Sequence, residues 1–270
     1  MAYEWIVDAL EATWDSVDRV VRDRPAEAYR AATPCPGWSV QDVLAHLLGF
    51  ESALNGEPAP EFAGSYPEYV RNDIGRLNEA YVAHYRDVPG PEVLARFRDV
   101  TAASVVRLRG LSDEAWETIG WSPEGDRPYY RFMETRVLDS WIHLQDIRDA
   151  LLEPADDHGP GEEIVVNRFE AALPYVVGKR MSAPEGFRLR LNVSGRAGRS
   201  VTVEVVDGRA RAVPSVEGDV TVEVTTPVAL FWRRAAGRIS AEAFLGASAT
   251  DVRGDRRAAQ DFAEGLAIMI

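Results

Sequence analysis

Residues 135–150 constrain the fold of this chain more than any other segment, because they combine a helical pattern with polar groups at core positions. Asp139 and His143 are four residues apart and Asp146 follows three residues later, so a helix would place all three on one face. The positions around them are mostly apolar, which indicates that this helix lies in a core. Carboxylates and imidazoles are costly to bury without a compensating partner, and a divalent metal ion would be one.

A catalytic zinc-type site usually takes three protein ligands and leaves one position open, so Asp139 and His143 require a further ligand. The chain holds 4 histidines. His46 lies in an apolar helical pattern and is the natural candidate, whereas His84 and His158 lie in polar surroundings that favour the surface. The sequence therefore predicts a metal site at His46, Asp139 and His143. The alternative is a buried network in which each imidazole bonds a carboxylate and no metal is present.

The composition limits both the site and its partners. Cys35 is the single cysteine, which excludes an intramolecular disulfide and a cysteine-based zinc cage, and its Pro-Cys-Pro context favours a packing role over a nucleophile. The formal net charge of -13 argues against nucleic acid and leaves small molecules or proteins. We find no apolar run long enough to span a membrane and no secretory signal, so we expect a cytoplasmic protein, either a monomer or a small homo-oligomer.

Amphipathic segments predict a helical N-terminal domain. We expect helices over residues 4–23, from 40 to about 55, over 66–87, from 91 to about 108, and over 129–152. Ser39 with Asp42 fits a capping box, and this helix start sets the direction of His46. Four long helices and one accessory helix fit an antiparallel bundle, in which inward side chains on facing helices build metal sites.

The hydrophobic period changes after residues 153–161, which have the composition of a linker. The expected elements are a helix over 162–181, strands over 187–193, 201–205 and 220–224, and short helices near 228–234 and 256–267. The strands alternate apolar and polar residues, as antiparallel strands with one solvated face do, and Asp207-Gly208 predicts a hairpin turn. We therefore expect an α+β chain with a helical domain over 1–155 and a smaller α+β domain over 162–270.

The stretch TPCPGWSVQDVLAHL, residues 33–47, resembles the mycothiol-dependent maleylpyruvate isomerase family, as does the later acidic-x-x-x-His-x-x-Asp helix. The resemblance implies an N-terminal DinB-like metal-binding bundle and a sterol-carrier-like C-terminal domain with an antiparallel sheet. By position, His46 and His143 match the family's histidine ligands, and Asp146 matches an aspartate that orients a ligand. Asp139 stands where the family usually has Glu, and its side chain is shorter by one carbon. Either the ligands must therefore lie closer together, or a water molecule must bridge Asp139 and the ion.

The resemblance also implies a chemistry. A divalent metal, with zinc as the expected ion, would lower the pKa of the mycothiol thiol. The thiolate would add to the cis double bond of maleylpyruvate or a similar electrophile, and elimination after bond rotation would return the trans isomer. Arg238, in a Gly-Arg pair that resembles a family signature, is the candidate catalytic residue that binds a substrate carboxylate. The alternative function is a non-catalytic small-ligand-binding protein with a structural or vacant metal site.

Overall fold

The computed structural model describes residues 2–155, 159–213 and 218–269. It divides into two compact units, Met1–Gly161 and Glu162–Ile270. His84 is exposed, as expected, and His158 lies outside the described residues. Within the described ranges, every helix is too short or too polar to cross a bilayer.

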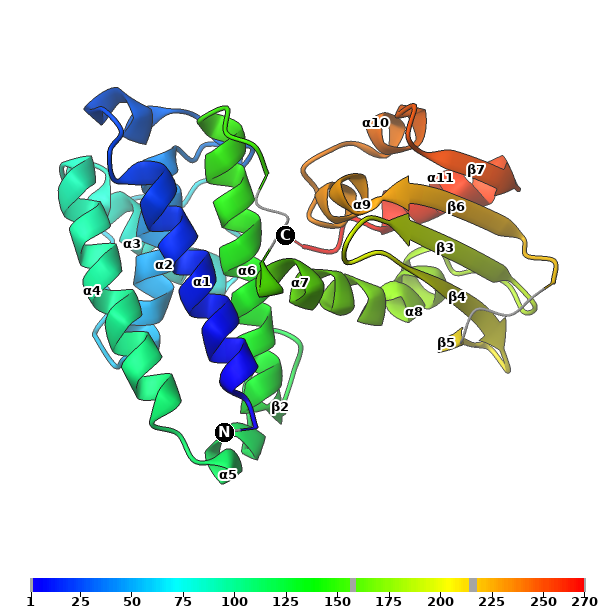
Figure 1. The fold of residues 1–270 in the computed structure, drawn as a ribbon, viewed down its shortest axis with the longest axis horizontal. Helices are drawn as coiled ribbons and strands as arrows, with labels where there is room; N and C mark the ends of the chain where they lie inside the picture. Colours follow the sequence, from blue (N-terminus) through cyan, green and yellow to red (C-terminus); the bar gives the residue numbers. More distant parts are fainter. Residues whose placement is uncertain (1, 156–158, 214–217, 270) are drawn as a thin grey trace. The chain divides into compact units, whose positions relative to one another are not determined.

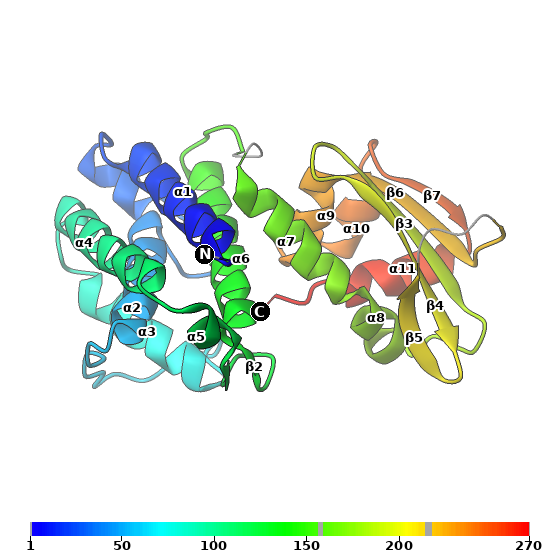
Figure 2. The same ribbon diagram turned by 60° about the horizontal axis from the view of Figure 1, so that its bottom comes forward.

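Four long helices form the bundle of the first unit (Figure 1, Figure 2). They are α1 (Glu4–Val21), α2 (Val40–Leu54), α4 (Gly90–Arg109) and α6 (Tyr129–Ala150). Both α1 and α2 contact α4 and α6, so the four helices close a ring around a shared apolar core. The remaining elements are η1 (Ala26–Arg30), α3 (Asp73–Tyr85), α5 (Asp113–Glu117), β1 (Ile119–Gly120) and β2 (Arg127–Pro128). The predicted N-terminal helical bundle is confirmed.

Capping residues set where these helices begin. Ser39 caps α2 in a complete capping box with Asp42, as the sequence predicts. The helix expected over 66–87 is shorter than predicted, because the Asn72 side chain accepts a hydrogen bond from the Gly75 amide and begins α3 at Asp73. The accessory helix α3 packs on α2, the helix that carries His46.

Within the described part of the second unit, five strands form one sheet in the order β5-β4-β3-β6-β7. They are β3 (Arg188–Ser194), β4 (Arg199–Val206), β5 (Arg209–Val213), β6 (Val222–Pro227) and β7 (Asp251–Gly254). Neighbouring strands pair antiparallel except β3 and β6, which run parallel. The expected purely antiparallel sheet is therefore wrong at this pairing, because alternation along a strand indicates a half-buried face and not the direction of the neighbouring strand.

Helical segments contact the sheet of the second unit, and alternate positions of β3 and β6 are buried. The segments in contact are α8 (Leu173–Tyr175), η2 (Val176–Arg180), α9 (Val228–Ala235) and α11 (Arg256–Gly265). The other two described helices are α7 (Pro160–Ala171) and α10 (Ala241–Gly246), which packs on α9 and α11 (Figure 2). The helix expected over 162–181 breaks after Ala171, since Pro174 has no N–H to continue the helical ladder. The sequence analysis did not predict α10 or β7, whereas the α+β class is confirmed.

Candidate metal centre

Two helices bring the predicted ligands together inside the bundle. His46 lies on α2, and Asp139 and His143 lie on α6, which packs against α2. The Nε2 atom of His46 is 3.1 Å from Asp139 Oδ2, and the Nε2 atom of His143 is 3.7 Å from Asp139 Oδ1. Both imidazoles are buried. Each oxygen of Asp139 therefore faces a different histidine.

The donor set fits a divalent ion. Two imidazole nitrogens and a carboxylate are typical zinc ligands, and ligand atoms on a tetrahedral ion with bonds of about 2.0–2.1 Å lie about 3.3 Å apart. The two separations at Asp139, 3.1 and 3.7 Å, lie on either side of that value. The rings of His46 and His143 meet edge to face with centroids 4.7 Å apart. These separations are compatible with direct binding of an ion by Asp139, and the choice between a tighter site and a bridging water stays a prediction.

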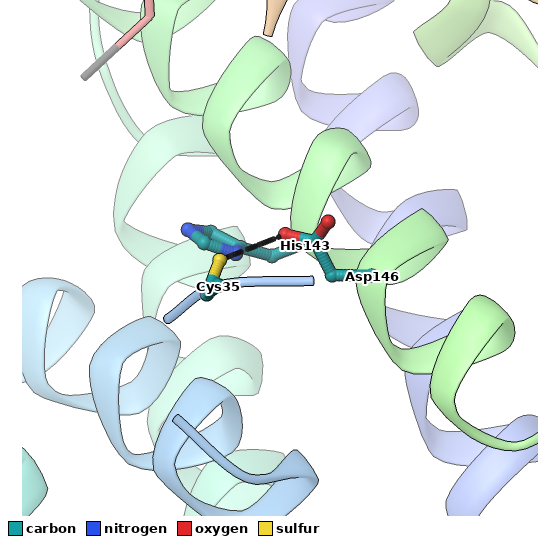
Figure 3. A group of neighbouring side chains, drawn as sticks. All are labelled: Cys35, His143 and Asp146. Atoms are coloured by element: carbon teal, nitrogen blue, oxygen red, sulfur yellow. Dashed lines mark hydrogen bonds and ion pairs between the residues drawn. The ribbon is translucent and has the colours of Figure 1, made fainter. Parts of the chain in front are cut away.

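The other nitrogen of His143 faces a second pair of side chains (Figure 3). Its Nδ1 atom is 3.0 Å from Asp146 Oδ2, and the thiol of Cys35 donates to the same oxygen over 3.2 Å. Cys35 Sγ is also 3.9 Å from His143 Nδ1. A carboxylate that accepts from Nδ1–H fixes the tautomer and leaves Nε2 free to bind a metal. The position of Asp146 suits the orienting role that the resemblance implies.

Cys35 is a member of this cluster that the sequence analysis missed. It lies 111 residues from Asp146 along the chain, so no local pattern connects the two. The Thr33 hydroxyl orders its loop by accepting from the Cys35 amide over 3.2 Å and donating to the Trp38 carbonyl over 2.8 Å. One sequence feature could have indicated that Cys35 lies near the site. Its stiff loop comes directly before the capped helix that carries His46.

Trp38 covers the imidazoles from the same loop. Its ring centroid lies 5.2 Å from that of His46 and 6.1 Å from that of His143. The indole N–H donates to the Tyr69 hydroxyl over 3.3 Å, and that hydroxyl donates to Glu79 over 2.8 Å. The indole therefore lies against the two imidazole rings, and its hydrogen bond to Tyr69 fixes its orientation.

A buried arginine, also missed from the sequence, lies on the carboxylate side of the site. Arg136 Nη1 donates to Asp139 Oδ2 over 2.6 Å, and its Nε donates to Glu51 Oε1 over 3.0 Å. The guanidinium lies over the Phe50 ring, 4.1 Å from its centroid, and the Ser104 hydroxyl donates to the other oxygen of Glu51 over 2.9 Å. Arg136 is three residues before Asp139, so the helical spacing could have placed it on the same face.

The electrostatics of the cluster follow from burial and these partners. Burial lowers the pKa of His46, although Asp139 opposes the shift. Burial acts to raise the pKa of Asp139, but His46 and Arg136 outweigh it and hold that pKa well below the usual carboxyl value. Burial acts to lower the pKa of His143, whereas Cys35 and the two neighbouring aspartates raise it to about 10. The groups around His143 therefore favour its protonated form, and a bound ion would compete with that proton.

Arg238, the candidate residue of the second unit, bonds the backbone. Arg238 is half-buried, and its guanidinium donates to the Ala236 carbonyl over 2.9 Å. Asp255 caps α11 by accepting from the Arg257 and Ala258 amides. Asp255 therefore begins a helix. The catalytic role of Arg238 stays a prediction.

The comparison with protein families identifies the first unit. Residues 10–148, just over half of the chain, match the family model described as the mycothiol maleylpyruvate isomerase N-terminal domain. The chain belongs to this family. The matched range includes His46, Asp139, His143 and Asp146.

Solved structures with the same fold agree with this family. The crystal structure of the mycothiol-dependent maleylpyruvate isomerase aligns with a TM-score of 0.55 and 19% identity, covering 88% of this chain and 90% of that chain. A mutant of that isomerase with one histidine replaced by alanine aligns with a TM-score of 0.54 and 18% identity over the same shares. At these identities the likeness establishes the fold. The search of curated proteins found no match.

Proposed function

We propose that this protein is a metal-dependent thiol-transfer enzyme that uses mycothiol and acts on a small electrophile. The observation that carries the proposal is the meeting of His46, Asp139 and His143 around one point inside the bundle. Membership of the mycothiol maleylpyruvate isomerase family supports mycothiol as the thiol. Isomerisation of maleylpyruvate or a similar cis acid is the specific reaction that we propose. A cytoplasmic location and a monomer or small homo-oligomer remain predictions.

Three residues would hold the ion, and their neighbours would keep them in place. His46, Asp139 and His143 are the ligands, and zinc suits this set of two nitrogens and one carboxylate. A metal ion held by these residues would lower the pKa of a coordinated thiol and so supply thiolate at neutral pH. Asp146 accepts from His143 Nδ1–H and keeps Nε2 directed at the ligand site.

The bond changes take place in the thiol and the electrophile, and side chains of the protein position these two substrates. The thiolate sulfur bonds one carbon of the cis double bond, the resulting single bond rotates, and loss of the thiolate restores the double bond as trans. Trp38 shields one side of the imidazoles and excludes water there. Arg238 is the proposed partner of a substrate carboxylate, as a guanidinium can bind both oxygens.

A second function is favoured by the hydrogen bonds among the same side chains. His46 bonds Asp139, His143 bonds Asp146, and Arg136 adds a positive charge beside Asp139. Such a network gives His46 Nε2, His143 Nδ1 and both carboxylates a partner without an ion, although His46 Nδ1 and Arg136 Nη2 are buried without a hydrogen-bond partner. A non-catalytic small-ligand-binding protein with a structural or vacant site is therefore the alternative.

Elemental analysis of the full chain, purified without chelator or metal-affinity tag, separates the two functions. We expect about one equivalent of zinc or a similar ion in the wild type and none in His46→Ala or Asp139→Ala, as a three-ligand site loses its ion with one ligand. His84→Ala, at an exposed histidine, is the matched control and should keep the ion. The metal-loaded protein should also be stabilised against heat by added mycothiol. A wild type that cannot be loaded would leave the ligand-binding function.

A further inference from the structure

A chain of buried groups reaches Asp139 from the far side of the bundle. It runs from Ser104 on α4 to Glu51 on α2, and from there to Arg136 and Asp139 on α6. Glu51 is 0% exposed and Arg136 is 3% exposed. Neither belongs to the proposed ligand set, although Arg136 contacts the same Asp139 oxygen that faces His46.

The Glu51–Arg136 ion pair lies directly beside a proposed ligand. Arg136 Nε is 3.0 Å from Glu51 Oε1, and Arg136 Nη1 is 2.6 Å from Asp139 Oδ2. Glu51 and Arg136 cancel each other, so the pair adds no net charge beside Asp139. Uncompensated charge costs several kcal/mol in a buried setting, so a guanidinium without Glu51 would lower the affinity for a cation at Asp139.

We propose that Glu51 neutralises the Arg136 charge beside Asp139, and that the balance of this pair determines the affinity of the metal centre for a divalent cation. This inference rests on the proposed function, because it concerns the same ion. Glu51 neutralises Arg136, which would otherwise repel a cation bound at Asp139. Arg136 in turn holds the Asp139 carboxylate, so that its two oxygens face the two histidines.

A pair that only held α2 against α6 would behave differently. Removing either partner would then lower the thermal stability of the protein without a specific effect on the ion. The double variant would also be no more stable than a single variant, because the ion pair between α2 and α6 would be missing in both. In a charge-balancing pair, the double replacement restores the net charge of the wild type and with it the affinity for the ion.

The test measures zinc affinity of the full chain by competition with a chromophoric chelator. The variants are Glu51→Gln, Arg136→Gln and the double variant, with the unfolding temperature of each metal-free protein as the second measurement. We expect Glu51→Gln to bind zinc at least tenfold more weakly than the wild type, which is about 1.4 kcal/mol. The double variant should recover most of that loss even where its unfolding temperature stays low.

Glu134→Gln is the matched control. Glu134 is a buried glutamate on α6 that bonds Arg131 over 2.9 Å, and its replacement should leave zinc affinity unchanged. Equal affinity of Glu51→Gln and the wild type would overturn the inference and leave the proposed function standing. A folded double variant that binds zinc no more tightly than Glu51→Gln would also overturn the inference. A wild type that binds no zinc would instead contradict the proposed function.

Discussion

The two units of the chain use polar side chains in contrasting ways. In the first unit, Asp139, His143 and Asp146 bond side chains of one another and of other segments inside a core. In the second unit, Arg238 donates to a backbone carbonyl and Asp255 accepts from backbone amides. The contacts of the first unit gather metal-competent groups at one place, whereas the two contacts of the second unit fix local backbone.

This contrast makes the two units separable by mutation. Replacements in the first unit should change metal binding, and replacements in the second should change stability or substrate binding without loss of the ion. The four predictions that follow test this separation, starting with the largest expected change in free energy.

Gly254→Ala should destabilise the second unit. Gly254 has φ +86°, and a Cβ there would lie 2.4 Å from the Thr221 carbonyl oxygen. We expect the free energy of unfolding to fall by about 2–4 kcal/mol, from backbone strain plus the clash, with zinc content unchanged. Urea unfolding and elemental analysis are the measurements. Gly208→Ala, also at positive φ but in open space, should cost less. Loss of zinc in a Gly254→Ala protein whose bundle is folded would contradict the separation.

Asp146→Asn should weaken the metal site without removing it. The substitution keeps the shape of the side chain but removes the charge that holds His143 Nδ1–H. We expect zinc affinity to fall about 10- to 100-fold, as is usual when the partner of a ligating histidine is changed. Chelator competition measures this, and unchanged affinity would show that the tautomer of His143 is fixed by another group.

Arg238→Ala should affect the acidic substrate and leave the ion in place. Loss of a charge-assisted hydrogen bond costs about 1.5–3 kcal/mol, so KM for maleylpyruvate should rise about tenfold or more. Steady-state kinetics with saturating mycothiol give KM, and elemental analysis should show wild-type zinc content. Arg238→Lys, which keeps the charge without the bidentate geometry, should fall in between. If KM stays the same, Arg238 serves the fold of its loop.

Cys35→Ser should have the smallest effect. A serine hydroxyl can donate to Asp146 as the thiol does, so we expect zinc affinity to stay within about threefold of the wild type. Cys35→Ala removes the donor and should cost about 0.5–1.5 kcal/mol in the same chelator assay. A complete loss of zinc in Cys35→Ser would identify the sulfur as a ligand of the ion. The ion would then lie on the Nδ1 side of His143, with Cys35 and Asp146, and not on the Nε2 side, with Asp139.

Local sequence features account for much of the helical unit. The 3.6-residue period, the Ser39–Asp42 capping box and the four-residue spacing of Asp139 and His143 all act within one or two helical turns. They place the bundle helices and turn two of the ligands onto one face. The start of α3 was placed too early, because the Asn72 cap outweighs the periodicity.

Alternation also predicts β3, β4 and β6 of the second unit, but it predicts neither β7 nor the direction of β6 beside β3. Pairing between strands that are distant in the sequence depends on which sheet edges meet, and no local pattern contains that information. The sterol-carrier-like character of this unit remains a prediction from the resemblance.

The sequence by itself determined the helical bundle, the α+β class and the choice of His46, Asp139 and His143 as candidate ligands. Only the tertiary structure decided that Cys35 meets Asp146 and that Glu51 neutralises Arg136 beside Asp139. The physical reason is distance along the chain. Helical spacing brings together residues three or four apart, whereas 111 residues separate Cys35 from Asp146 and 85 separate Glu51 from Arg136, so only the packing of the bundle brings them into contact.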